Sequence, residues 1–278
     1  MVTKKLKAKN TSREGKRAQR KRSGTPRRRK RPSKTRISPW ILAGALVFLA
    51  AGLLFPYLRS GRFASAGAAV PKDARSFCVD ISHHNDAIVW DSLKVVVDRS
   101  GRTSKDVLRA KAVYPVSSVI IKATEGEKLV DKKFKEYWNE AGQRDCRRGA
   151  YHFFRTSKNP SRQAAHYIAT VRLSHKDLPP VLDVETMHAG CTKKELNDKV
   201  LVWLREVEKH YGRKPIVYTS DSFACDLLSP DITANYPMWI ARYNKKEPRF
   251  KDWTMWQFTE EALVYGANGG YVDLSVIK

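Results

Sequence analysis

The stretch LPPVLDVE, residues 178–185, decides the fold of this chain. A proline pair ends the preceding segment, a short apolar run follows, and Asp183 and Glu185 close the stretch. Side chains of a strand alternate between its two faces, so both carboxylates project from one face, roughly 6.6 Å apart along the backbone. That arrangement suits chemistry in which one carboxyl group donates a proton while the other stays ionised. The competing interpretation is a strand that runs into an acidic, solvated loop.

Seven further stretches have the composition of strands, which makes eight in all. They are residues 77–82, 117–126, 149–155, 214–220, 236–243, 253–259 and 270–276. Apolar residues at helical spacing mark helices over 131–144, 160–173 and 193–211. Strands that alternate with helices predict a parallel α/β sheet, and eight strands predict a closed barrel.

The connections between these strands differ in length. The last two are too short for a crossover helix, so helices are expected after the first five strands and not after the last three. Residues 90–115, between the first two strands, predict a β-hairpin followed by a short helix. The expected fold is therefore an irregular, TIM-like barrel that occupies residues 76–278.

Positive charge is concentrated at the N-terminus. Residues 1–38 contain 17 Lys and Arg and a single acid, Glu14, whereas the whole chain has a net charge of +25. With almost no apolar residues, this segment is expected to be a disordered basic tail. A role in binding nucleic acid or anionic lipid is conceivable on charge alone. A topology signal is the preferred interpretation, and no specific nucleic acid is expected as a partner.

The next segment, residues 39–58, contains no charged residue and predicts a transmembrane helix. Trp40 and Tyr57 stand at its two ends, where aromatic rings favour the membrane interface. The basic residues before it predict a cytoplasmic N-terminus, with the domain after the linker 59–75 on the exported side. The alternative is a cleaved signal peptide, since Ala64-Ser65-Ala66 resembles a cleavage site.

Four cysteines follow, Cys78, Cys146, Cys191 and Cys225, all on the predicted exported side. An even number in an oxidising compartment indicates disulfides, and Cys191 with Cys225 is the expected pair because both follow neighbouring strands. Four reduced thiols are the alternative. None of the cysteines has a C-x-x-C or His-rich spacing, so neither a metal nor a cofactor is expected.

Further acids stand at the ends of other predicted strands. Asp80 belongs to the first strand and Asp273 to the eighth, and these two strands become neighbours when a barrel closes. With Asp183 and Glu185 they place four carboxyl groups at one mouth. Crowding of this kind raises the pKa of at least one carboxyl group, as a general acid requires.

Aromatic and amide side chains are predicted to share that mouth. They are Tyr151, Phe153, Tyr218, Trp239, Trp256 and Gln257. Inward aromatics on strands usually belong to a core, but rings beside acids also suit the binding of a sugar. Their coincidence with the four acids favours the sugar interpretation.

The motifs VDIS, VIIKATEG, GAYHFFR, LPPVLDVE, KPIVYTS, PMWIARY, MWQFT and VDLS, in this order, resemble the glycoside hydrolase family 25 lysozymes. The resemblance spans residues 77–276 and implies a (β/α)5(β)3 barrel. It also implies cleavage of the β-1,4 bond between N-acetylmuramic acid and N-acetylglucosamine in peptidoglycan glycan strands. By the same resemblance, Glu185 matches the general acid, and Asp183 matches either the nucleophile or the carboxylate that steadies the substrate's acetamido group.

The remaining roles rest on the same resemblance. Asp80 and Asp273 match supporting acids, and Tyr151 and Tyr218 match rings of the cleaved subsite. One departure is visible, because His83-His84-Asn85-Asp86 stands where the family commonly has an aromatic residue followed by Gln-Gly. The two histidines are interpreted as polar loop residues rather than metal ligands. The alternative to a muramidase is a catalytically weak protein that binds peptidoglycan in the cell envelope.

Overall fold

The computed structural model describes residues 67–85, 87–244 and 246–278. The predicted basic tail 1–38, the predicted transmembrane helix 39–58 and residues 59–66 of the linker 59–75 lie outside these residues. Within the described part of the chain, no helix is both long enough and apolar enough to cross a bilayer.

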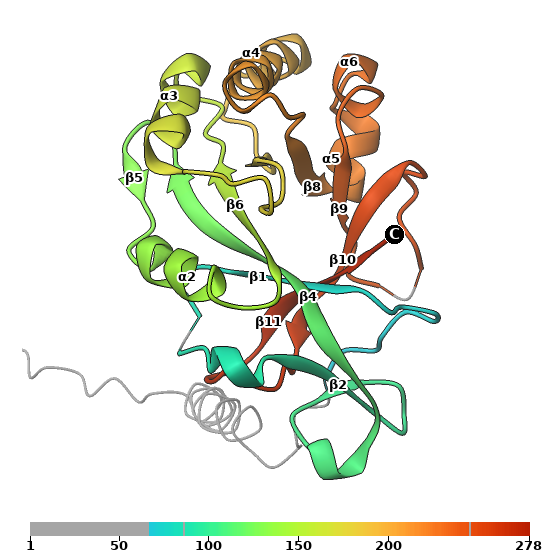
Figure 1. Cartoon of the computed structure of the whole chain (residues 1–278). Helices are drawn as coiled ribbons and strands as arrows, with labels where there is room; N and C mark the ends of the chain where they lie inside the picture. The colour runs from blue at the N-terminus through green and yellow to red at the C-terminus, as the bar shows by residue number, and fades with distance from the viewer. Residues whose placement is uncertain (1–66, 86, 245) are drawn as a thin grey trace, which may run out of the picture. The chain divides into compact units, whose positions relative to one another are not determined.

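Eight strands close into a barrel (Figure 1). Around the barrel they are β1 (Phe77–Ile81), β4 (Ala110–Glu125), β6 (Arg147–Phe153), β7 (Val181–Asp183), β8 (Ile216–Ser220), β9 (Met238–Ala241), β10 (Trp253–Ala262) and β11 (Val272–Ile277). Neighbours from β1 to β10 are parallel. The last strand, β11, is antiparallel to both β10 and β1 and so closes the ring. The predicted eight-stranded barrel is confirmed.

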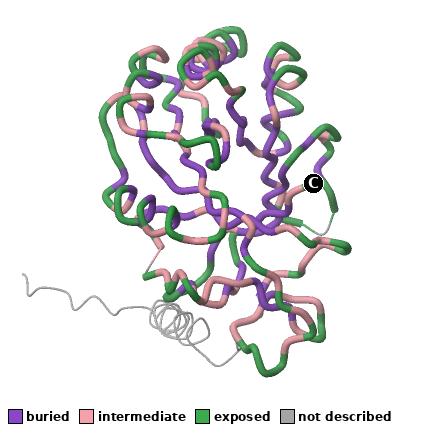
Figure 2. Tube along the Cα trace, viewed as in Figure 1, coloured by how far each residue is buried: buried purple, intermediate pink, exposed green. Residues whose placement is uncertain are grey.

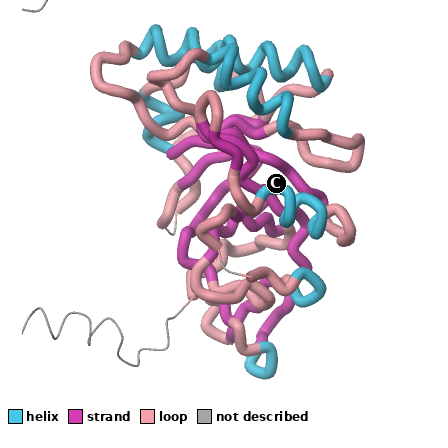
Figure 3. The backbone as a smooth tube through the Cα atoms, turned by 90° about the vertical axis from the view of Figure 1, so that its left-hand side faces the viewer, coloured by secondary structure: helices cyan, strands magenta, loops and turns pink. Residues whose placement is uncertain are grey.

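The α-helices connect the middle strands of the barrel. They are α2 (Phe134–Ala141), α3 (Pro160–Thr170), α4 (Lys193–Tyr211), α5 (Asp221–Asp226) and α6 (Pro230–Thr233). In the described residues that join β9 to β10 and β10 to β11 there is no α-helix, as predicted. Figure 3 shows α3 and α4 together on one side of the strands, and residues of these two helices pack against each other.

The first connection contains the predicted β-hairpin, and the short helix that follows it is a 3-10 helix, so among the described residues no α-helix follows the first strand. Residues 90–109 form two 3-10 turns, η1 (Trp90–Ser92) and η2 (Val107–Arg109), and the hairpin strands β2 (Lys94–Asp98) and β3 (Thr103–Ser104). β4 is 16 residues long, and its first part pairs with β2 before its second part enters the barrel. The β-branched run Val95–Val97 is buried, which explains why the first strand of the hairpin forms there.

Local sequence sets the bounds of α4. The Thr192 side chain accepts a hydrogen bond from the backbone N–H of Glu195, and Gly212 ends the helix in a left-handed conformation with φ 66°. Between these caps Leu196, Val200, Trp203, Leu204 and Val207 are buried on one face. The helix predicted over 193–211 is therefore confirmed at both ends.

The buried residues, shown in purple in Figure 2, form two core clusters. A larger cluster packs the helices and the hairpin against the strands, with Trp203, Tyr167 and Phe154 among its fully buried residues. A smaller cluster contains alternate strand residues from around the ring, including Cys78, Ile120, Val181, Ile216, Trp239 and Met255. Cys78 lies two residues before Asp80 and Val181 two before Asp183, so these pairs share a face of their strands. The smaller cluster is therefore the floor beneath the acids.

Candidate active site

The four predicted acids meet at the C-terminal ends of the parallel strands. Asp80 is directly opposite Asp273 in the β1–β11 register, and Asp183 is opposite Phe153 on β6 and Tyr218 on β8. The charge of Glu185 acts on all three aspartates. Residues separated by almost 200 positions in the sequence are thus brought into one site by closure of the barrel.

Asp80 and Asp273 form a pair that shares a proton. Burial, followed by the charge of Asp273, raises the pKa of Asp80 well above its ordinary value. Burial also raises the pKa of Asp273 to about 6, although a hydrogen bond with Asp80 opposes this rise. Two neighbouring carboxylates do not both ionise readily, so a proton is favoured on Asp80 over Asp273.

Asp183 and Glu185 differ in exposure. β7 ends at Asp183, which is 6% exposed, whereas Glu185 lies two residues beyond the strand and is exposed. Burial is the main cause that raises the pKa of Asp183 well above its ordinary value, and the charge of Glu185 adds to it. The buried Asp183 Oδ1 has no hydrogen-bond partner among the described residues. An unpaired carboxylate oxygen at this position can accept a hydrogen bond from a ligand N–H or O–H.

Gln257 on β10 connects three groups of the site. Its Nε2 donates to Asp80 Oδ2 at 2.9 Å, while its Oε1 accepts from the Tyr218 hydroxyl at 2.8 Å and from the Tyr243 hydroxyl at 2.6 Å. Gln257 is 1% exposed. Gln257 is predicted to bind substrate, and in the structure it positions Asp80 and Tyr218. Tyr243 was not predicted, although it directly ends the motif PMWIARY.

Tyr151 and Phe153 lie on the same face of β6, as predicted. Both are partly exposed. Burial and then the charges of Asp183, Asp80 and Asp273 raise the pKa of the Tyr151 hydroxyl well above its ordinary value, which places this hydroxyl among the acids. The Phe153 ring lies 5.1 Å from Lys122 Nζ and 4.6 Å from the Arg155 guanidinium carbon, at the rim of the site.

The two predicted tryptophans do not present their rings to the mouth. Trp239 is 2% exposed, its Nε1 donates to Ser275 Oγ at 3.0 Å, and its ring packs edge-on against Tyr218. Trp256 is 3% exposed, and its Nε1 donates to the Arg242 carbonyl at 3.0 Å. Adjacent strand residues point to opposite faces, so Gln257 and Trp256 could not both face the site. Burial leaves little of either ring exposed, so the geometry of the site does not support the prediction that these tryptophans bind substrate.

The sequence did not predict three polar residues of the site, which are Lys122, Glu125 and Asp131. Lys122 is 9% exposed, forms a 2.7 Å ion pair with Glu125, and its charge lowers the pKa of Asp183. Asp131 is 3% exposed and its Oδ2 lies 2.5 Å from His83 Nδ1. This pair attaches the His83-His84 loop to the start of α2. Glu125 belongs to the motif VIIKATEG, but no pattern in the sequence indicated the contact between Asp131 and His83, which are 48 positions apart.

The predicted Cys191–Cys225 disulfide is not formed, because all four cysteines are free thiols. Cys191 is half-buried beside Glu195 and Lys199, whereas Cys225 is exposed on α5 beside Asp221 and Arg249. Neighbouring strands do lead to these residues, but their side chains have different surroundings. Proximity of strands was therefore too weak a basis for the pairing.

Comparisons with known proteins agree with this architecture. The sequence model of glycosyl hydrolases family 25 matches residues 79–267. Protein YegX of Escherichia coli (strain K12) is 36% identical over 202 residues, which cover 72% of this chain and 68% of YegX. Lysozyme M1 of Streptomyces globisporus is 27% identical over 206 residues, covering 69% of this chain and 64% of that protein.

A solved structure shows the same fold. A family 25 glycosyl hydrolase from Bacillus anthracis superimposes with a TM-score of 0.63 at 28% identity, covering 78% of this chain and 94% of that one. The matched residues 79–267 include Asp80, Asp183 and Glu185. The chain belongs to glycosyl hydrolases family 25.

Proposed function

We propose that this protein is an N-acetylmuramidase, a lysozyme that hydrolyses the β-1,4 bond between N-acetylmuramic acid and N-acetylglucosamine in peptidoglycan. The observation that carries the proposal is the acid pair at the end of β7, in which a buried Asp183 with a raised pKa stands beside an exposed Glu185. Membership of family 25 and the similarity to Lysozyme M1 support the same substrate class.

The exposed Glu185 is the general acid. The Glu185 charge and a hydrogen bond between the two side chains both favour a proton on Asp183. When the glycan covers Glu185, that carboxyl group also leaves water and takes up the shared proton. It then delivers the proton to the leaving oxygen as the C1–O bond breaks.

Asp183 then stands ionised beneath the sugar. Its Oδ1 is free to accept a hydrogen bond from the acetamido N–H of the substrate. Held in this way, the acetamido oxygen attacks C1 and forms the new C–O bond while the leaving group departs. Water afterwards attacks C1, Glu185 takes up its proton, and the acetamido group is regenerated with the configuration retained.

The decisive experiment measures the release of muropeptides from purified peptidoglycan by the full-length chain. Glu185→Gln preserves shape but removes the ionisable proton, so we expect turnover to fall by about 10²–10⁴-fold with the fold intact. The matched control is Asp252→Asn. Asp252 is an exposed acid directly before β10, at the end of the barrel away from the four acids, so this variant should retain full activity. Reducing N-acetylmuramic acid ends, detected by mass spectrometry, identify the bond that is cut.

The opposite result is equally clear. If the wild type pellets with the cell wall but releases no fragments, the protein is a peptidoglycan-binding protein without turnover. If Glu185→Gln and the wild type have equal activity, Glu185 is not the general acid.

The proposal extends to the location of the enzyme. The uncharged segment 39–58 and the basic residues before it support a single-pass membrane protein with a cytoplasmic N-terminus and an exported catalytic domain. In intact spheroplasts, external protease should then degrade the catalytic domain, while an epitope placed within residues 1–38 stays protected. Protection of both segments would contradict this topology, as would recovery of a domain that lacks residues 39–58.

A further inference from the structure

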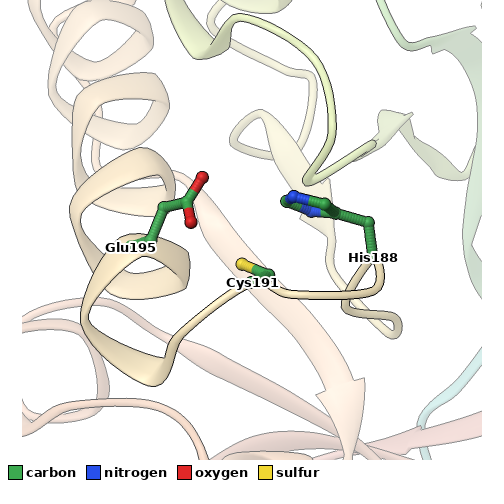
Figure 4. Close-up of side chains that lie close together, drawn as sticks. All are labelled: His188, Cys191 and Glu195. Carbon is green, nitrogen blue, oxygen red and sulfur yellow. The ribbon is translucent and has the colours of Figure 1, made fainter.

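The loop between β7 and α4 gathers three potential metal ligands. His188 and Cys191 come from the loop and Glu195 from the first turn of α4, and their ligand atoms all lie within 4.8 Å of one another. Figure 4 shows the three side chains directed towards a common space. Each is partly exposed, so an ion can reach this space from solvent.

Local backbone structure creates this arrangement. The Cys191 N–H donates to the His188 carbonyl at 3.1 Å, which closes a four-residue turn, and Gly190 in that turn has φ 82°. A left-handed residue at the third position is what a type II turn requires, and glycine adopts it without strain. Thr192 then caps α4 through the Glu195 N–H at 3.1 Å, which fixes Glu195 one helical turn beyond Cys191.

Two further contacts orient the ligands. The His188 ring Nδ1 lies 3.1 Å from Thr156 Oγ1, and the His188 backbone N–H donates to the same oxygen at 2.9 Å. With Nδ1–H directed at Thr156, the lone pair of Nε2 is available for a metal. Lys199 Nζ contacts Glu195 Oε1 at 2.7 Å and the Thr156 carbonyl at 2.8 Å, which leaves Glu195 Oε2 for a metal.

We propose that His188, Cys191 and Glu195 bind a divalent transition metal ion, with Zn²⁺ as the best match. One thiolate, one imidazole and one carboxylate form a ligand set of borderline softness, which suits Zn²⁺ better than Mg²⁺ or Ca²⁺. The thiolate and the carboxylate neutralise the two charges of the ion, although the nearby Lys199 opposes binding. Cys191 releases its proton to solvent when the metal–sulfur bond forms.

Formation of the site needs only a small movement. Ligand atoms around tetrahedral zinc are separated by about 3.3–3.8 Å, because the bonds are about 2.0–2.3 Å long. The distances between the three ligand atoms, now up to 4.8 Å, therefore have to shorten by about 1 Å. Small rotations of the partly exposed side chains achieve this. Three protein ligands leave a fourth position open to water.

The proposed metal site lies in the same loop as the general acid. Glu185 lies three residues before His188, so an ion bound to His188 and Glu195 would connect this loop to α4. The spacing H-x2-C-x3-E did not predict a metal site from the sequence, because it matches none of the common zinc motifs. Metal binding itself is independent of the proposed muramidase activity.

The test adds Co²⁺ to the full-length chain, purified in detergent with a non-thiol reductant. Cobalt bound to a thiolate gives an intense charge-transfer absorption, which reports the Co–S bond directly. We expect one Co²⁺ per chain in the wild type and competition by Zn²⁺. Cys191→Ser should abolish the charge-transfer band, whereas Cys225→Ser, the matched change at an exposed cysteine, should leave it intact.

Two other variants test the geometry. His188→Gln should weaken Co²⁺ binding on the order of 100-fold, and Thr156→Val, which removes only the hydroxyl group that orients His188, about 10–100-fold. Circular dichroism checks that each variant remains folded. A wild type without the band overturns the proposal, and so does a band that survives in Cys191→Ser. A loss of equal size in His83→Gln would assign the ion to the His83-His84 loop and also overturn it.

Discussion

The charge of a single nearby residue shifts the pKa of Asp273, which lies on β11 where the barrel closes. The pKa of Asp273 is raised to about 6, mainly by burial, and the charge of exposed Glu260 contributes to this rise. If ionised Asp273 is needed to stabilise the positive charge that develops on the sugar, the activity falls as the pH drops below about 6. Glu260→Gln removes a charge that favours protonation, so the acidic limb of the profile of kcat/KM against pH should move to lower pH.

The neighbouring residue offers a matched control for this prediction. Glu261 is also exposed and on β10, but it is not among the groups that shift the pKa of Asp273. Glu261→Gln should therefore leave the acidic limb where the wild type has it. A shift of equal size in both variants would indicate a general field effect, and no shift in Glu260→Gln would separate the acidic limb from Asp273.

At the scale of elements, His152 links β6 to α3 and α4. Its ring stacks on Trp203 at 5.6 Å, and its two nitrogens contact Thr124 Oγ1 at 2.7 Å and Gln163 Oε1 at 3.2 Å. Gln163 Oε1 also accepts from the Arg155 N–H, which makes it an acceptor for His152 Nε2–H. The neutral ring is thus fully hydrogen-bonded, and burial lowers the pKa of His152 to about 3.

This packing predicts a loss of stability in acid. Between about pH 6 and pH 4 the unfolded chain binds a proton at His152 that the folded chain does not, so the free energy of unfolding should fall by about 1.4 kcal/mol per pH unit from this group. Asp80, Asp183 and Asp273 have raised pKa values and act in the opposite direction over part of this range. The comparison of wild type with His152→Asn at each pH isolates the histidine.

Urea unfolding between pH 7 and pH 4.5 provides the measurement. The wild type should lose roughly 2 kcal/mol more than His152→Asn over this range. If the free energy of unfolding falls with pH equally in both proteins, His152 is protonated in the folded state, which contradicts the prediction. The variant is expected to be less stable at pH 7, because it loses the ring contact with Trp203, but only the difference in slope tests the prediction.

On the scale of the whole molecule, the sequence predicted the barrel, the order of its strands and the four acids. Those features depend on period-two and helical patterns and on strand ends, which are local properties. The Gln257 contacts with Asp80, Tyr218 and Tyr243 could not be predicted, because they join three strands and the segment after β9 through side-chain geometry. The burial of Trp239 and Trp256 could not be predicted either, since an aromatic residue near a strand end has the same sequence pattern whether its ring faces the mouth or the core.

The pairing of β1 with β11 has a consequence for the timing of activity. β1 is the first barrel strand to leave the ribosome and β11 the last, and each supplies one aspartate of the shared pair. An incomplete polypeptide therefore has Asp80 without its partner and a barrel with an open seam. We therefore expect the enzyme to be inactive throughout its synthesis. It gains its full set of acids only when β11 pairs with β1 and closes the barrel.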